Sequence, residues 1–303
     1  MTAAGPAPAS VRTKAAPGGR SAPGNRPVGT LGLDPYAPEA PVSGRTPGAQ
    51  EPMTTHDPAA VSPSVLDRAR AVWSRLTGTD AEFAPGRTNV AVAPASLLSP
   101  PGWTGLVVLG DAALVTVPDS RTAGLVTAAL QGLGPDELAG ELAEPGRLRE
   151  RLPFHDLLGP AHLLFLAPVL FRPAARTADV ERVSGDDPEL LALLDRCGPG
   201  DAAESALAGI TSTAKAVRQD GEIVAAAGHE LWPHGTAHLS ILTDPGFRRR
   251  GLAAQVASAA VADALDQGLL AQWRARSPAS RRIAHSLGFQ ETGLQLSLRL
   301  ADR

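Results

Sequence analysis

The sequence predicts an α/β protein with two folded regions that follow an N-terminal arm. Three observations lead to this prediction. The chain has 303 residues, and at roughly 100–200 residues per domain this length suits two domains. Residues 1–52 hold ten prolines and eight glycines, with no Phe, Ile or Trp. In the C-terminal part, short strand patterns alternate with helical patterns, which is typical of α/β structure. We therefore expect an arm at 1–55, an α/β domain at 60–176 and a second at 177–303.

The arm is expected to be disordered. A segment of this composition buries too little apolar surface to offset the entropy lost on ordering. Met53 lies near its end and is an alternative start of the protein.

The first folded region begins with a helix signal, because Ser64 is followed three residues later by Asp67, as in a capping box. Gly110 and Asp111 separate two β-branched runs and predict a hairpin. We expect helices at 64–76, 121–130 and 135–142, and strands at 89–93, 104–109, 112–117 and 162–166. The region contains no catalytic motif that we could identify, so its role stays open.

The second region alternates regularly between strands and helices. Gly268 and Gly288 follow helical patterns and suit helix C-termini. We expect strands at 180–183, 213–218, 222–231, 236–242, 270–275 and 294–300, with helices at 187–196, 249–267 and 278–287.

Charge and apolar patterning exclude several classes of protein. The net charge is −3, from 28 basic and 31 acidic residues. This charge produces no strong positive electrostatic field that would attract nucleic acid or anionic membranes. No apolar run approaches the roughly 18 residues of a membrane span. The single cysteine, Cys197, fits a reducing compartment. We therefore expect a cytoplasmic protein. We also expect no metal site, because the three histidines of one hairpin, His229, His234 and His238, have no cysteine nearby that could complete a set of metal ligands.

The most informative segment is the passage from the strand ending near Thr243 to the helix after it. Pro245 stops the strand, and a turn with three arginines and Gly251 opens the helix. The first turn of a helix has unpaired N–H groups and partial positive charge, so it suits an anion such as a pyrophosphate. Because the helix dipole disfavours arginine in its first turn, the run of arginines indicates function.

This segment resembles the acetyl-CoA motif of the GNAT superfamily, whose pattern is Arg/Gln-x-x-Gly-x-Gly/Ala. Residues 248–253 match it in full, and residues 277–289 resemble the family's Asn-x-x-Ala-x-x-Leu-Tyr-x-x-Leu-Gly-Phe helix. The order of elements over about 178–303 also fits. The arrangement, with an obscure first domain, is similar to two-domain GNAT proteins of GC-rich bacteria.

The resemblance implies a GNAT fold, a mixed twisted sheet with helices on both faces, and acetyl-CoA as co-substrate. It implies that two strands part to admit the pantetheine arm, whose amides pair with Ile241, Leu242 and Thr243. It places the pyrophosphate on the helix after the arginines, so the remaining expected cofactor-binding residues are Arg248, Arg249, Arg250, Gly251, Leu252, Ala253 and Ser277. A neutral primary amine would attack the thioester, with a small molecule or a peptide N-terminus as acceptor.

Two departures from the family pattern leave the proton path open. Ser277 replaces the usual Asn, and Ala284 replaces the Tyr that protonates the leaving thiolate. The remaining candidates for acid or base are Glu230 and His238. Two other functions therefore stay open, a catalytically silent acyl-CoA sensor and an interaction scaffold, as does the oligomeric state.

Overall fold

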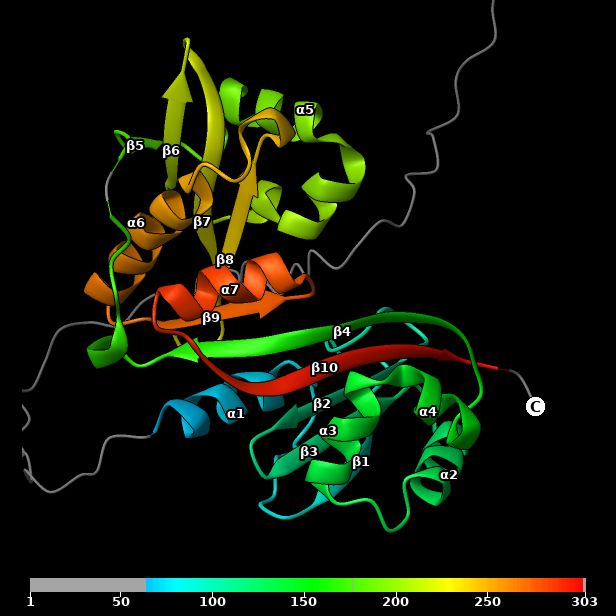
Figure 1. The fold of residues 1–303 in the computed structure, drawn as a ribbon. Coiled ribbons are helices and arrows are strands. Elements are labelled where there is room, and N and C mark those ends of the chain that lie inside the picture. Colours follow the sequence, from blue (N-terminus) through cyan, green and yellow to red (C-terminus); the bar gives the residue numbers. More distant parts are fainter. Residues whose placement is uncertain (1–63, 176, 302–303) are drawn as a thin grey trace, which may run out of the picture.

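The strands of both predicted regions join one mixed ten-stranded sheet (Figure 1). The computed structural model describes residues 64–175 and 177–301, so the predicted arm lies outside the described residues. The strand order is β1-β3-β2-β10-β4-β9-β8-β7-β6-β5. The strands are β1 (Thr88–Val92), β2 (Thr104–Leu109), β3 (Ala112–Val117), β4 (Phe154–Leu166), β5 (Glu181–Val183), β6 (Ala214–Gln219), β7 (Glu222–Trp232), β8 (Thr236–Thr243), β9 (Leu270–Ala275) and β10 (Gln290–Leu300).

Helices cover both faces of this sheet, as the predicted fold class requires. The helices are α1 (Val65–Arg75), α2 (Ser120–Ala129), α3 (Pro135–Ala143), α4 (Pro145–Arg151), α5 (Pro188–Ser205), α6 (Leu252–Asp266) and α7 (Pro278–Ser286). Three short 3-10 turns are η1 (Pro168–Leu170), η2 (Leu207–Gly209) and η3 (Pro245–Phe247). The predicted capping box forms at α1, where Asp67 N donates to Ser64 Oγ at 3.1 Å.

Most expected elements are present, and several differ. Strand β10 begins at Gln290, four residues before the expected start at 294. The expected strand at 162–166 is the end of the longer β4, whose polar first half is held by pairing with β10. Helix α4 was not expected, because it is short. Helix α5 continues past the expected end at residue 196 and kinks at Gly198, where φ is 79°.

Strands β4 and β10 connect the two predicted regions. β10 pairs antiparallel with β2 on one side and with β4 on the other, and β4 also pairs antiparallel with β9. The sheet therefore runs without interruption across the predicted boundary at 176/177, although the division into two domains stays a prediction.

Side chains alternate between the two faces of the sheet along each strand, and this alternation shows which face α1, α5, α6 and α7 cover. On β8, Ala237 and Leu239 pack in the cluster under α6, whereas Leu242 packs with α5 residues on the opposite face. On β4, Leu163 and Phe165 pack with α1, and Leu164 and Leu166 pack in the α6 cluster. Helices α1 and α5 thus cover one face, and α6 with α7 covers the other.

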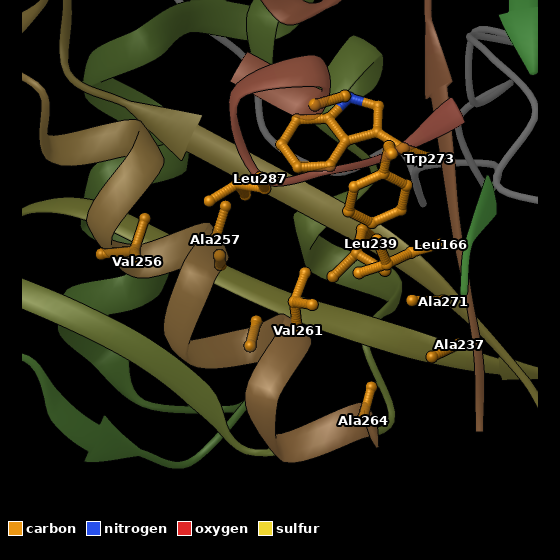
Figure 2. Packing of buried hydrophobic residues seen from close by; sticks show 14 of the residues in the cluster. Leu166, Ala237, Leu239, Val256, Ala257, Val261, Ala264, Ala271, Trp273 and Leu287 are labelled. Atoms are coloured by element: carbon orange, nitrogen blue, oxygen red, sulfur yellow. The ribbon is translucent and has the colours of Figure 1, made fainter. Parts of the chain in front are cut away.

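The core under α6 is built largely of alanine, which lets the helix approach the sheet closely (Figure 2). Ala257 and Ala264 of α6 are buried beside Ala237 and Ala271 of the sheet, and Trp273 fills the space beneath α7. Close packing of this kind fixes the direction in which α6 leaves the strand end before it.

We predict that residues 177–303 alone do not fold cooperatively. In this fragment β9 loses its neighbour β4, β10 loses both β2 and β4, and the α6 cluster loses Leu164 and Leu166, both fully buried. Circular dichroism of the truncated and full chains during heating provides the measurement. A sharp melting transition of the fragment would show instead that 177–303 is an autonomous domain.

Candidate functional site

The candidate site begins where β8 and β9 part. These parallel strands share only three residue pairs, of which His238–Gln272 is the last. β8 continues to Thr243 while staying paired with β7, and β9 turns away across the molecule (Figure 1). The second half of β8 therefore presents a backbone edge that β9 does not occupy, as the expected parting of the strands requires.

The chain leaves β8 through a tight turn and starts α6 at Leu252. Gly251 is the N-cap, with φ of 77°, and no side chain caps the helix. A Cβ on Gly251 would meet only Gln255 Nε2, at 4.0 Å, so the space in front of the helix is open. The first turn carries no acidic residue. Among the described residues, the partial positive charge at this helix end is thus left without a side-chain anion.

The expected start of this helix at Arg248–Arg249 is wrong. Arg249 has φ of 63° and Gly251 has φ of 77°, and such left-handed residues cannot continue a right-handed helix. The arginines consequently precede the first turn instead of occupying it. The argument that they break the helix-dipole preference no longer applies, because they lie in the turn.

The three arginines have different surroundings. Arg248 pairs with Asp201 of α5, and its Nε donates to Thr243 O at 3.2 Å, which ties the turn to α5. Arg250 donates to Gly246 O at 3.3 Å and lies 4.9 Å from the Phe247 ring centroid. No interaction within the described ranges holds Arg249, which is exposed at the surface of the turn.

The free edge of β8 runs from His238 to the turn that precedes α6. Between His238 and Thr243 the strand advances five residues, or about 16 Å at roughly 3.3 Å per residue. Ile241, Leu242 and Thr243 lie on the far part of this edge, next to the turn. An extended chain with a terminal anion can follow the edge with the anion on α6.

The two expected catalytic candidates lie next to each other. Glu230 and His238 are direct cross-strand partners on β7 and β8, so their side chains share the α1/α5 face. Trp232 joins them: its Nε1 donates to Glu230 Oε2 at 3.0 Å, and its ring stacks on the His238 ring with centroids 4.2 Å apart.

A buried hydrogen-bond chain determines which His238 nitrogen carries the proton. Trp73 Nε1, which can only donate, binds Gln272 Oε1 at 3.1 Å. The Gln272 amide nitrogen therefore faces His238 Nδ1, at 3.3 Å, and donates to it. His238 Nδ1 is the acceptor, so the neutral ring carries its proton on Nε2.

Burial, together with a smaller effect of the nearby positive charge of Arg274, lowers the pKa of His238 to about 3. An imidazole with this pKa is neutral across the physiological range. Such a group is poorly matched to act as a general base near neutral pH, but its Nε2–H can donate a hydrogen bond.

The departures from the family pattern have structural roles. Ser277 caps α7, because its side chain accepts from Ser280 N at 3.1 Å. Ala284 is fully buried in the cluster beneath α6. Trp273 is also buried, and its Nε1 donates to Ser280 Oγ at 2.8 Å. The described residues contain no tyrosine, and Tyr36 lies outside them.

Two further features were compared with this site, a possible metal centre and a cavity beside α6. Within 64–175 and 177–301, no group of three or more His, Cys, Asp or Glu side chains could hold a metal ion. His229 and His238 cannot meet across the hairpin, because their registers place them on opposite faces. A cavity of about 340 Å³ lies between α6, strands β5 and β6 and the segment 171–180, where Lys215 pairs with Asp263 at 2.9 Å.

Comparison with known proteins agrees with this geometry. The profile of the family described as GNAT acetyltransferase matches residues 215–293, from β6 into β10. This part of the chain is a GNAT acetyltransferase domain. No curated protein matches the chain.

Solved structures of GNAT proteins are similar to the chain at low identity. A GCN5-related N-acetyltransferase from Kribbella flavida is 22% identical, with a TM-score of 0.41, over 53% of this chain and 65% of that protein. A GCN5-related N-acetyltransferase-like protein from Streptococcus suis is 14% identical, with a TM-score of 0.42, over 78% of this chain and all of that protein.

Sequence reasoning missed Trp73 and Gln272. Both lie in segments read as ordinary helix and strand, and they meet across 199 positions of the chain. The available signal was Gln272 between apolar neighbours, since a glutamine that is buried in a strand requires a polar partner.

We predict that His238 makes the protein less stable in mild acid. Its folded pKa of about 3 lies below the ordinary value of 6.5, so below pH 6.5 the unfolded chain binds a proton that the folded protein does not. The free energy of unfolding should therefore fall by about 1.4 kcal/mol per pH unit from this residue between pH 6.5 and 3. Above pH 6.5 this contribution is constant.

Urea unfolding of His238→Gln and wild type at several pH values provides the measurement. Between pH 6 and 4.5, the free energy of unfolding of the variant should change less steeply with pH than that of wild type, by the equivalent of about one bound proton. His229, whose pKa burial also lowers, contributes equally in both proteins. Parallel slopes would mean that His238 takes up its proton in the folded state.

Proposed function

We propose that the protein is an N-acyltransferase that moves an acetyl group from acetyl-CoA to a primary amine. The observation that carries this proposal is the open edge of β8 leading directly to the uncapped N-terminus of α6. The GNAT family match supports acyl transfer in general.

The proposal gives each part of acetyl-CoA a partner. The pantetheine amides pair with the backbone of Ile241, Leu242 and Thr243 on the edge that β9 leaves free. The pyrophosphate lies against the N–H groups of the first turn of α6, from Leu252 and Ala253 onward. Arg249 and Arg250 add positive charge from the turn, whereas Arg248 holds the turn in place through Asp201.

Acyl transfer here depends mainly on positioning. The neutral amine attacks the thioester carbonyl, the carbon–sulfur bond breaks, and a proton leaves the amine while the thiolate of CoA departs. Glu230 is the group that we propose to accept this proton. His238 is proposed to act as a neutral hydrogen-bond donor through Nε2, since its low pKa does not suit a base.

A catalytically silent acyl-CoA sensor is the second candidate. Burial of Ala284 where the family pattern has Tyr favours it, because no tyrosine of the described chain can protonate the thiolate. A thiol with a pKa near 8.5 is nevertheless a tolerable leaving group as thiolate at neutral pH. We therefore favour a slow enzyme.

The setting of the reaction also belongs to the proposal. No helix of the described ranges is long and apolar enough to cross a bilayer. We propose that the enzyme works in the cytoplasm on a small amine or a peptide N-terminus, without nucleic acid, membrane or metal as partner.

We predict that Gly251→Asp abolishes acetyl-CoA binding. A carboxylate at the N-cap of α6 would occupy the place of the pyrophosphate and repel it. In wild type, a hundredfold excess of acetyl-CoA over its Kd should raise the free energy of unfolding by about 2.7 kcal/mol. Calorimetry measures the binding, and thermal unfolding measures the stabilisation.

Gly268→Asp is the matched control for this variant. Gly268 follows the other end of α6, also has a positive φ, of 71°, and also faces open space. The two variants introduce similar backbone strain and the same charge, so only their position differs. Equal acetyl-CoA affinity in wild type and Gly251→Asp would refute the assigned pyrophosphate site.

We predict that Glu230→Gln changes the pH dependence of turnover. In wild type, kcat/KM should rise with pH as the base or the amine loses its proton. Gln keeps an oxygen acceptor for Trp232 Nε1 but cannot take up the proton, so the acidic limb should flatten or move. CoA release from a panel of amines, measured between pH 5.5 and 9, checks this.

Two outcomes would contradict parts of this assignment. The same pH profile in both proteins would remove Glu230 from the mechanism. Tight acetyl-CoA binding with no CoA release from any amine would favour the sensor.

A further inference from the structure

A half-buried arginine lies on the same face as the candidate catalytic residues. Arg274 follows Gln272 by two residues on β9, so both side chains point to the α1/α5 face. Gln272 binds His238 at the last β8–β9 pair. Arg274 therefore lies about 7 Å further along β9, at the side of the opening between the strands.

The guanidinium of Arg274 has no hydrogen bond or ion pair with any residue in the described part of the chain. The acidic group that acts on its charge is Glu204 of α5, and Glu204 is already bound by Arg276 at 2.9 Å. Glu204 is thus already paired with Arg276, and the three side chains together carry an excess positive charge.

Keeping this charge away from water has an energetic cost. Burial and, to a smaller extent, the charge of Arg276 lower the pKa of Arg274 to about 10, while Glu204 opposes this change. The residue stays protonated at neutral pH. A partly desolvated cation without a partner is unfavourable for the empty protein, and an anion bound beside it removes the penalty.

We propose that Arg274 binds an anionic oxygen group of the acceptor, a carboxylate or a phosphate, and so selects amines that carry such a group. This proposal rests on the proposed acyl transfer. A planar guanidinium matches both groups through two parallel N–H···O bonds, which fixes orientation as well as position.

The position of Arg274 explains how the anion would orient the amine. Glu230, His238 and Arg274 share one face, whereas Gly251 and α6 approach β8 from the other end of the opening. An acceptor held by its anionic end at Arg274 can direct a nearby amine toward the residues at the parting of β8 and β9. The anions of the two substrates would bind separate cationic groups.

Paired substrates test this proposal on the full chain. Alanine is compared with alaninamide, and phosphoethanolamine with ethanolamine, so that each pair differs in the anionic group. Wild type should favour the anionic member. In Arg274→Gln, kcat/KM for that member should fall about 10- to 100-fold, as expected for loss of a charge-assisted bond. The neutral member and the KM for acetyl-CoA should stay within about threefold of wild type.

Arg282→Gln is the matched control, because it removes an exposed arginine of α7. It should leave both pairs unchanged. A larger fall in kcat/KM for alanine in Arg274→Gln identifies a carboxylate as the bound group, and a larger fall for phosphoethanolamine identifies a phosphate. Equal losses for anionic and neutral members, or no preference in wild type, would overturn the proposal.

The test also separates this proposal from the acyl transfer on which it rests. If none of these amines causes wild type to release CoA, the proposed enzyme function fails. Thermal unfolding with alanine, phosphoethanolamine or inorganic phosphate then reads the anion site directly. An increase in Tm for wild type and not for Arg274→Gln supports the site, and equal responses overturn it.

Discussion

The arrangement of the candidate site depends on the point at which β8 and β9 stop pairing. His238 and Gln272 form the last pair, and their side chains are hydrogen-bonded to each other on the α1/α5 face. If the two strands stayed paired to Thr243, the edge of β8 would be filled by β9. Because they part, five residues of backbone and the start of α6 become available to one extended ligand.

Buried side chains stabilise the point where β8 and β9 part, and one tryptophan contacts each residue of the last pair. Trp73 of α1 binds Gln272, Trp232 of β7 stacks on His238, and Trp73 and Trp232 meet edge to face with centroids 6.0 Å apart. Helix α1 belongs to the predicted first region, whose role was obscure from sequence. Through Trp73 that region contacts the candidate site, so it contributes to the geometry of the site.

Positive charge is distributed over the two ends of this opening. At one end, the α6 N-terminus has no side-chain cap and follows a turn with three arginines, of which Arg248 is already paired. At the other end, Arg274 lies near the neutral imidazole of His238 and has no hydrogen-bond or ion-pair partner among the described residues. Net charge is −3 for the whole chain, so only the folded structure shows that cationic groups gather here.

The sequence by itself determined the local elements and the cofactor end of the site. Period-2 and helical patterns located most strands and helices, because each depends on which residues of a short segment face the core. Residues 248–253 indicated the anion site, because proline, glycine and the following helix are neighbours in the chain. The start of α6 was misplaced because positive φ at Arg249 is not visible in a motif.

Only the tertiary structure decided which side chains meet across strands. The register of β7 and β8 brings Glu230 opposite His238, and pairing of β4 with both β9 and β10 merges the predicted regions into one sheet. Trp73 meets Gln272 and Arg274 is left without a partner because elements far apart in the sequence fold against one another. Such contacts, and the burial that lowers the pKa of His238, arise from packing between distant segments, which local sequence patterns do not encode.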